Sequence, residues 1–191
     1  ENIDSIKQLI PFQKDTVKLK SYGALNRILL GKDTPLSKLY LDSLTIGAER
    51  LYSKKFIALS LTRTGYYYYH NSDYYKAELY YTKAIHAYRE LKLKGSLYRT
   101  LNTLGIVQKY LGKFEKSMQS HLESLKLKEE MNVQGKGIIA SYVNIGNLQA
   151  ELKNFESSNE YYSKAAEICE KENLKEYLPS IWSNIGLNYQ D

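Results

Sequence analysis

Apolar and polar residues follow one another along this chain with the periodicity of amphipathic helices. Large apolar and aromatic side chains recur at spacings of three, four and seven residues. These spacings place them on one face of an α-helix. The three prolines, Pro11, Pro35 and Pro179, lie at expected helix boundaries, so none of them interrupts a helix. The pattern therefore predicts an all-α protein.

The helical pattern itself repeats. Gly65, Gly105, Gly146 and Gly186 stand 40, 41 and 40 residues apart. Four positions before each glycine comes a large apolar residue: Leu61, Leu101, Tyr142 or Trp182. Nine positions after the first three glycines comes an aromatic residue: Tyr74, Phe114 or Phe155. Self-similarity at such a period indicates a repeat architecture, so we expect an array of similar units.

Each copy is predicted to form two antiparallel helices, A and B. The glycine lies in the middle of helix A, where it costs about 1 kcal/mol of helix propensity relative to alanine. We expect close approach of helix B to require the missing side chain, because small residues recur on helix B. These are Ala77, Ser117 and Ser158, followed seven positions later by Ala84, Ser124 and Ala165. One pair cannot bury its apolar face alone, so the stack of pairs would form the core.

The array is expected to cover residues 14–191, with residues 1–13 as a separate N-terminal segment. The copies lie at approximately 14–53, 54–93, 94–134, 135–174 and 175–191, which is about four and a half repeats. In the degenerate first copy Leu25 replaces the glycine, and Thr34 is the expected N-cap of helix B. The long period is expected to lengthen helix B, which Gly95, or Gly135 with Gly137, would close.

These features make the chain resemble the tetratricopeptide repeat family, whose pattern is W-x2-L-G-x2-Y followed by A-x3-F, A and P. The residues that match this pattern are Trp182, Ile185, Gly186 and Tyr189 in its opening and Ala77, Tyr81 and Ala84 in its second half. The period exceeds the usual length of about 34, and the terminal proline is absent from each copy. The resemblance implies an α-solenoid of antiparallel helix pairs wound into a right-handed superhelix.

The resemblance also implies a protein- or peptide-binding groove lined by helix A. The positions that would face it lie two and six before each glycine and one and five after it. The candidate contacts are Arg63, Tyr66, His70, Arg99, Tyr110, Asn144, Asn147 and Asn184, with Asp191 at the equivalent place in the last copy. Asn144 and Asn184 would donate to and accept from a peptide backbone, or would instead bond to the neighbouring helix. Arg63 and Arg99 are candidates for binding a carboxylate.

Composition narrows the classes of function. The net charge is +6, but lysines alternate with glutamates, as in LKLKEE at 125–130, so we expect a solvated face and no nucleic-acid partner. Cys169 is the only cysteine, and the three histidines lack ligand spacing, so neither a metal nor a cofactor is expected. His121 is expected in the core. No nucleophile and base recur together, which argues against an enzyme.

Three functions stay open. The segment 15–30 and the glycine-bearing repeats resemble long-period repeats of bacterial signalling proteins. That resemblance implies an extracytoplasmic sensor region of a histidine kinase or a transcriptional regulator, with any kinase domain elsewhere. The alternatives are a cytoplasmic peptide receptor of the quorum-sensing type and a passive scaffold. No apolar run reaches eighteen residues, so no membrane insertion is expected. Because the last repeat stops at Asp191, we expect a fragment or a processed form.

Overall fold

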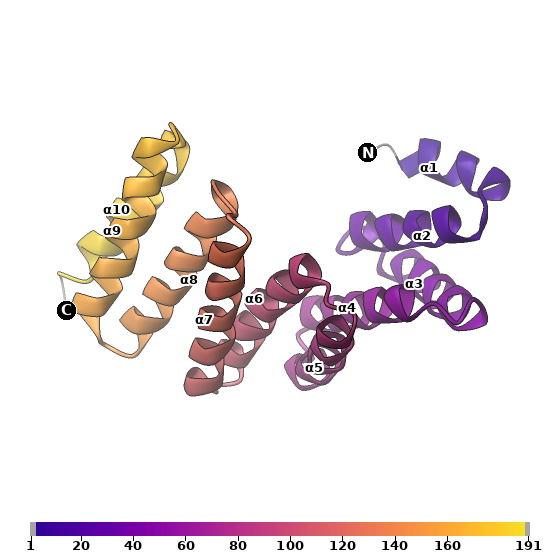
Figure 1. The fold of residues 1–191 in the computed structure, drawn as a ribbon, viewed down its shortest axis with the longest axis horizontal. Coiled ribbons are helices and arrows are strands. Elements are labelled where there is room, and N and C mark those ends of the chain that lie inside the picture. Colours follow the sequence, from indigo (N-terminus) through magenta and orange to yellow (C-terminus); the bar gives the residue numbers. More distant parts are fainter. Residues whose placement is uncertain (1–2, 190–191) are drawn as a thin grey trace. The chain divides into compact units, whose positions relative to one another are not determined.

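The computed structural model describes residues 3–189, and every regular element within that range is a helix (Figure 1). The elements are α1 (Ile3–Leu9), a 3-10 helix (Ile10–Phe12), α2 (Asp15–Leu29), α3 (Thr34–Arg50), α4 (Lys54–His70), α5 (Tyr74–Glu90), α6 (Lys94–Tyr110), α7 (Phe114–Glu130), α8 (Lys136–Glu151), α9 (Phe155–Lys171), a second 3-10 helix (Lys175–Tyr177) and α10 (Leu178–Leu187). The predicted all-α class is confirmed. The chain divides into a first unit, Glu1–Ser96, and a second unit, Leu97–Asp191.

Helix length explains the period. The helices α4, α5, α6 and α7 each contain 17 residues, and three-residue turns separate them. Two such helices with their two turns account for the 40-residue repeat. In these two copies helix A and helix B are equally long, and the expectation that glycines close a lengthened helix B is wrong. Gly95 lies in the first turn of α6, and Gly135 is the N-cap of α8 with Gly137 following inside that helix, so these glycines begin A helices and do not close B helices.

Each helix from α3 to α9 ends in the same hydrogen-bonded turn. The second turn residue has a positive φ, and these residues are Tyr52, Ser72, Lys92, Gly112, Asn132, Lys153 and Asn173. After α5, for example, the Lys92 N–H donates to the Arg89 carbonyl at 3.1 Å and the Leu93 N–H donates to the Tyr88 carbonyl at 3.0 Å. This is the Schellman motif, which satisfies carbonyls left open at a helix end.

Two B helices of the first unit begin with an aspartate cap. The Asp33 Oδ1 accepts from the Leu36 N–H at 2.9 Å, so Asp33 is the N-cap of α3, and the predicted cap, Thr34, is its first residue. Forty residues later the Asp73 Oδ1 accepts from the Lys76 N–H at 3.2 Å and caps α5. Aspartate is thus the N-cap of both α3 and α5, in agreement with the known preference of N-cap positions.

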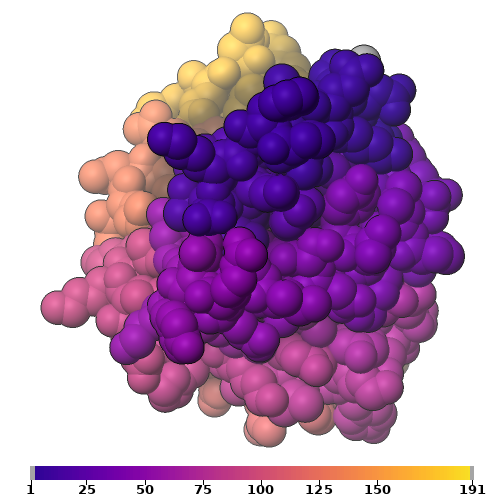
Figure 2. Space-filling view, turned by 90° about the vertical axis from the view of Figure 1, so that its right-hand side faces the viewer, coloured from indigo at the N-terminus to yellow at the C-terminus, as the bar shows by residue number. Residues whose placement is uncertain are grey.

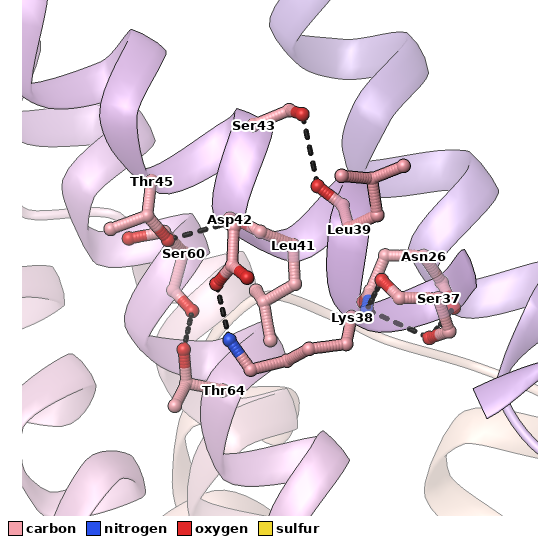
Figure 3. Close-up of polar contacts among 10 residues, drawn as sticks. All are labelled: Asn26, Ser37, Lys38, Leu39, Leu41, Asp42, Ser43, Thr45, Ser60 and Thr64. Atoms are coloured by element: carbon pink, nitrogen blue, oxygen red, sulfur yellow. Dashed lines mark hydrogen bonds and ion pairs between the residues drawn. The ribbon is translucent and has the colours of Figure 1, made fainter. Parts of the chain in front are cut away.

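The first unit is held together by apolar packing and a buried polar pair. Leu19, Leu44, Ala48 and Phe56 form one cluster of its core. Where α2 meets α3, the Asn26 Nδ2 donates to the Ser37 carbonyl and hydroxyl, both at 3.1 Å, and the Ser37 Oγ donates to the Asn26 carbonyl at 2.9 Å (Figure 3). By contrast α1 buries no side chain. Its indigo residues lie at the surface in Figure 2.

The repeat glycines of helix A are covered by rings from helix B. A Cβ placed on Gly65 would lie 2.9 Å from the Tyr81 ring, and one on Gly146 would lie 2.7 Å from the Tyr162 ring. On Gly105 it would lie 2.7 Å from the His121 ring. Helix B therefore does approach the glycines, and the atoms nearest to an added Cβ belong to rings.

The small residues of helix B lie close to these contacts. Ser117 Oγ donates to the Gly105 carbonyl at 2.7 Å, and Ser158 Oγ donates to the Gly146 carbonyl at 2.9 Å. The alanines of this set, Ala77, Ala84 and Ala165, are fully buried. In the last repeat, Gly186 has no atom within 4 Å of such a Cβ, and Trp182 is 50% exposed.

The order of contacts in the second unit shows antiparallel pairs. Gly105 of α6 meets Ser117 of α7, and the Ser124 Oγ of α7 donates to the Tyr98 carbonyl of α6 at 2.8 Å, so the two helices run in opposite directions. The core of the second unit includes Ile139, Tyr162, Ala165, Ala166, Cys169 and Ile181. Cys169 is fully buried there, where burial raises the pKa of its thiol.

Candidate functional site

The predicted groove positions all lie on A helices. The first unit carries Arg63, Tyr66 and His70 on α4. The second unit carries Arg99 and Tyr110 on α6, Asn144 and Asn147 on α8, and Asn184 on α10. Asp191 lies outside the described residues. Arg63 and Arg99 belong to different units, so we treat the two surfaces separately.

Arg63 is the most unusual of these side chains. It is half-buried, and its Nε is buried without a hydrogen-bond partner. The groups that act on its charge are Arg27 and the tyrosines 66, 81 and 88. Burial, followed by the nearby positive charge of Arg27, lowers the pKa of Arg63. Since an arginine side chain remains protonated in proteins, this site holds an uncompensated charge.

The tyrosines that act electrostatically on Arg63 come from α4 and α5. Tyr81, from α5, is 1% exposed, and its hydroxyl is buried without a partner in the described part of the chain. Burial, together with Tyr66, raises the pKa of Tyr81. Electrostatic interactions with Tyr66, Tyr81 and Tyr88 act on the pKa of Arg63. The first unit therefore concentrates unsatisfied polar atoms around one helix A position.

The other predicted contacts on α4 pack against one another. The Tyr66 and His70 rings meet edge to face with centroids 4.5 Å apart, and Tyr69 lies 5.7 Å from His70. His70 is exposed, and Tyr66 is half-buried. The neighbouring Tyr68 instead stacks on Tyr80 of α5 at 5.5 Å. The end of α4 thus presents an aromatic surface beside Arg63.

In the second unit the asparagines bond from helix to helix. The Asn144 Nδ2 donates to the Asn102 Oδ1 at 3.1 Å, which joins α8 to α6. The Asn184 Nδ2 donates to the Asn147 Oδ1 at 3.3 Å, which joins α10 to α8. The Tyr162 hydroxyl donates to the same Asn147 oxygen at 2.6 Å. Of the two interpretations left open by the sequence, bonding to the neighbouring helix is present.

These bonds leave part of each carboxamide unused. A carboxamide has two N–H donors and an oxygen with two lone pairs, and Asn144 and Asn184 each use one donor in these bonds. The four asparagines, Asn102, Asn144, Asn147 and Asn184, are half-buried. We call them the asparagine row.

The remaining predicted contacts are exposed. The Arg99 guanidinium carbon lies 5.5 Å from the centre of the Tyr98 ring, a cation–π arrangement. Tyr110 is 55% exposed, and the Lys109 Nζ lies 6.0 Å from the centre of its ring. Lys109 also pairs with Glu151 of α8 at 3.0 Å. The Asn102–Asn144 contact comes one turn or more before the Lys109–Glu151 contact on both helices. The helices α6 and α8 therefore lie side by side and run in the same direction.

Sequence reasoning missed Lys128. It belongs to the stretch that reads as a solvated face, yet it is 4% exposed. Its Nζ donates to the Gly137 carbonyl at 2.9 Å and to the Ser141 Oγ at 2.6 Å, so it joins α7 to α8. Burial, and then Arg99, lowers its pKa to about 8. The 40-residue shift to Tyr88, also a buried position, is the signal that could have identified it.

His121 lies in the core, as the sequence suggested, with 2% exposure. Its Nδ1 has no partner among the described residues. Burial, and then the positive charges of Lys128 and Lys109, lowers its pKa to about 4. His121 is therefore neutral near pH 7, and its ring serves as packing against Gly105.

Metal-binding groups and membrane-spanning helices are both absent from residues 3–189. Histidine, cysteine, aspartate and glutamate side chains in that range do not gather into any group of three that could hold a metal. The same range contains no helix with the length and apolar character needed to cross a membrane.

One segment of the chain matches a known repeat family. Residues 139–172, which span most of α8 and all of α9, match the tetratricopeptide repeat. No curated protein sequence matches the chain.

Three solved structures are similar in fold. The signal transduction ATPase with numerous domains PH0952 from Pyrococcus horikoshii, which has a tetratricopeptide repeat sensor, aligns with TM-score 0.85 and 18% identity over 98% of this chain and 29% of that one. Aspartyl phosphate phosphatase F from Bacillus subtilis aligns with TM-score 0.82 and 17% identity over 96% and 48%. The Rap conjugation gene regulator of plasmid pLS20, in complex with the Phr* peptide, aligns with TM-score 0.67 and 10% identity over 98% and 57%.

In each case this chain spans less than two thirds of the neighbour's length. At these identities the likeness establishes the fold, a solenoid of antiparallel helix pairs. Residues 139–172 are thus similar to one tetratricopeptide repeat, and the chain as a whole shares the fold of proteins built from such helix pairs.

Proposed function

We propose that this chain is a non-catalytic repeat domain that binds a protein or peptide, and that it serves as the sensor or interaction region of a bacterial signal-transduction protein. The repeat type supports a role in protein interaction. The similarity to a repeat sensor and to a Rap regulator solved with a peptide supports the signalling context. The parent protein would be a histidine kinase or a transcriptional regulator.

The asparagine row is the observation that carries the proposal. Neighbouring packed helices lie roughly 8–10 Å apart, and an extended peptide advances about 3.3 Å per residue. A peptide crossing α6, α8 and α10 would therefore meet a carboxamide about every third residue. Each carboxamide retains hydrogen-bonding capacity after its bond to the next helix. Such a row suits the regularly spaced N–H and C=O groups of a peptide backbone.

The two alternatives differ in the partner. A peptide receptor of the quorum-sensing type would use the same row, and its support is the likeness to the Rap regulator. A passive scaffold would use flat exposed surfaces and would not need the row. One neighbour is named a phosphatase, but the candidate surface here offers carboxamides, guanidinium groups and tyrosines and not a paired nucleophile and base.

A display selection tests the proposal. A random library of displayed peptides is panned against the immobilised chain, and the selected peptides are titrated by fluorescence anisotropy. We expect selected peptides to lose about tenfold or more in affinity when Asn144 and Asn184 are both replaced by alanine, because two hydrogen bonds contribute about 1–3 kcal/mol. The control is Asn154→Ala, an exposed asparagine outside the row.

Circular dichroism must show unchanged helical content in the double variant, since Asn144 and Asn184 also bond to neighbouring helices. Failure to enrich any peptide would contradict the proposal. Equal affinity of the double variant and the parent would show that peptides bind elsewhere.

A further inference from the structure

We propose that α10 binds an amphipathic helix of a partner protein, which packs on it as helix B packs on helix A in the earlier copies. The docking surface is the side of α10 that bears Trp182, Gly186 and Tyr189, and we call it the α10 face. The inference goes beyond the proposed function, because Asn184 of the asparagine row lies on the opposite side of the helix from Gly186.

The first step is the glycine of the last copy. In the three earlier copies the glycine is buried under a helix B ring: Tyr81 on Gly65, His121 on Gly105 and Tyr162 on Gly146. Gly186 has the same place in the repeat, yet it is exposed, and a Cβ placed on it would meet no atom within 4 Å. Among residues 3–189, therefore, the ring that covers this glycine is missing.

The second step is the exposure of the residues around Gly186. Trp182 is 50% exposed, whereas Leu101, at the equivalent position of α6, is 3% exposed. Tyr189 is 79% exposed, whereas Gln108, its equivalent in α6, is 6% exposed. Exposed large aromatic residues that gather on one face are typical of surfaces that bind another protein. The α10 face is thus a helix A surface without its helix B.

The third step is the pattern of the occupant, which the chain itself shows three times. Each helix B that covers a glycine presents a small residue, a ring four positions later and a second small residue three positions after the ring. These sets are Ala77, Tyr81 and Ala84; Ser117, His121 and Ser124; and Ser158, Tyr162 and Ala165. The small residues let the two helices approach closely, so that the ring reaches the glycine. We infer that the partner helix carries the same pattern.

The fourth step is charge. A hollow of about 670 Å³ lies where α9 adjoins the end of α10, and Phe155 and Tyr189 line part of it. Its charged lining residues are Glu156, Glu160, Lys164 and Glu167. Three carboxylates against one ammonium make this flank negative. A partner helix that lies on the α10 face beside α9 would therefore carry lysine or arginine on the side that faces α9.

The only tryptophan of the chain, Trp182, reports on this face directly. The probe is a synthetic peptide with the sequence of α5, residues 74–90, which carries the pattern of Ala77, Tyr81 and Ala84. We expect a saturable blue shift of the Trp182 emission when the peptide is added, because the indole leaves water. The Tyr81→Ala version of the peptide should bind about tenfold or more weakly, since it lacks the ring.

Gly186→Leu is the decisive variant of the chain. Its side chain would fill the place of the partner's ring, so we expect it to abolish the shift. It meets no atom of the described chain, so urea denaturation should show stability like that of the parent. The matched control is Ser180→Leu, which adds the same side chain at an exposed position of α10 away from Gly186, and it should bind the peptide as the parent does.

A second peptide tests the charge. The α9 sequence, residues 155–171, has the same small–ring–small pattern but carries two lysines against four glutamates, whereas the α5 sequence carries three cations against two glutamates. We expect the α9 peptide to bind several-fold more weakly at low salt, and the difference to shrink as salt is added. Equal binding of both peptides at low salt would contradict the acidic flank.

Three results would overturn the proposal. These are no shift with the α5 peptide, an equal shift in Gly186→Leu, and equal binding of the Tyr81→Ala peptide. Light scattering that shows a dimer of the parent, dissociated by Gly186→Leu, would assign the α10 face to a second copy of this chain and would also overturn it. Peptides from the display selection should bind Gly186→Leu as they bind the parent, so each proposal can fail while the other stands.

Discussion

The two units use the same scaffold and differ in whether the hydroxyl of the tyrosine that covers a glycine has a partner. In both, a ring of helix B covers a glycine of helix A: Tyr81 on Gly65 in the first unit and Tyr162 on Gly146 in the second. The Tyr162 hydroxyl donates to Asn147 at 2.6 Å, whereas the Tyr81 hydroxyl is buried without a partner. The scaffold therefore does not decide whether the polar surface of a repeat is satisfied. The partner of the Tyr162 hydroxyl is the residue that follows the glycine, which is asparagine in that repeat and tyrosine in the repeat of Tyr81.

This difference has an energetic meaning. A buried donor without a partner costs about 1–3 kcal/mol, and a buried charge without one costs more. The second unit satisfies its row of asparagines before any ligand arrives. The first unit retains the Arg63 Nε and the Tyr81 hydroxyl unsatisfied. A ligand that pairs with these groups would gain more free energy in the first unit than it could from an already bonded row.

The largest predicted effect comes from disrupting the packing of a helix B ring on a helix A glycine, which both units share. Gly105→Leu should lower the free energy of unfolding by about 3 kcal/mol or more, because its side chain would occupy the space of the His121 ring. Gly65→Leu should cost a similar amount against Tyr81. Gly186→Ala is the control, since it meets no atom within 4 Å and should be neutral or stabilising. Urea denaturation measures all three, and parent-like stability of Gly105→Leu would contradict the shared packing.

The second prediction concerns acid. The pKa of His121 falls from its ordinary value of 6.5 to about 4 in the folded chain, so the folded state binds fewer protons than the unfolded state between these values. The contribution of His121 to the free energy of unfolding is therefore fully present above pH 6.5. It falls by about 3 kcal/mol in all as the pH falls toward 4.

Denaturation curves across that pH range should show the loss in the parent and not in His121→Phe. The exposed His86→Gln variant should behave as the parent does. A parent whose acid sensitivity equals that of His121→Phe would contradict the burial of a neutral imidazole. The first unit has Tyr81 at the equivalent position, so it should contribute nothing to this loss.

The third prediction concerns Arg63. Arg63→Met keeps the apolar stem and removes a charge with no partner, so it should stabilise the free chain by about 1–3 kcal/mol. Arg50→Met loses only an exposed ion pair and should stay within about 0.5 kcal/mol of the parent. Thermal unfolding without added anions compares them. Destabilisation by Arg63→Met would mean that the guanidinium has a partner and would weaken the contrast between the units.

The sequence predicts the repeated features of the fold and misses the pairwise ones. The period is visible at Gly65, Gly105 and Gly146, because a ring of helix B packs on each of these glycines. The turns could not be predicted in this way, since Tyr52 and Lys92 adopt a positive φ without the residue type that usually signals it. Helix packing on both sides of the turn imposes that conformation.

In the candidate site, likewise, the sequence predicts the positions of the residues and not the contacts between them. Its positions on the A helices follow from the register, and all described ones lie on the expected helices. Whether an asparagine or an arginine is satisfied depends on what the next helix presents, which a single sequence does not show. Asn144 bonds to Asn102 across 42 residues, and the charge of Arg27 on α2 acts on Arg63 of α4.

The two equivalent tyrosines give the most direct test. Tyr81→Phe and Tyr162→Phe remove one hydroxyl each from rings that cover a glycine in the same way. We predict that Tyr162→Phe lowers the free energy of unfolding by about 1 kcal/mol, because its bond to Asn147 is lost, and that Tyr81→Phe raises it by about the same amount. Urea denaturation of both variants beside the parent decides the matter. Opposite signs would support the contrast between the units, and equal losses in both variants would contradict it.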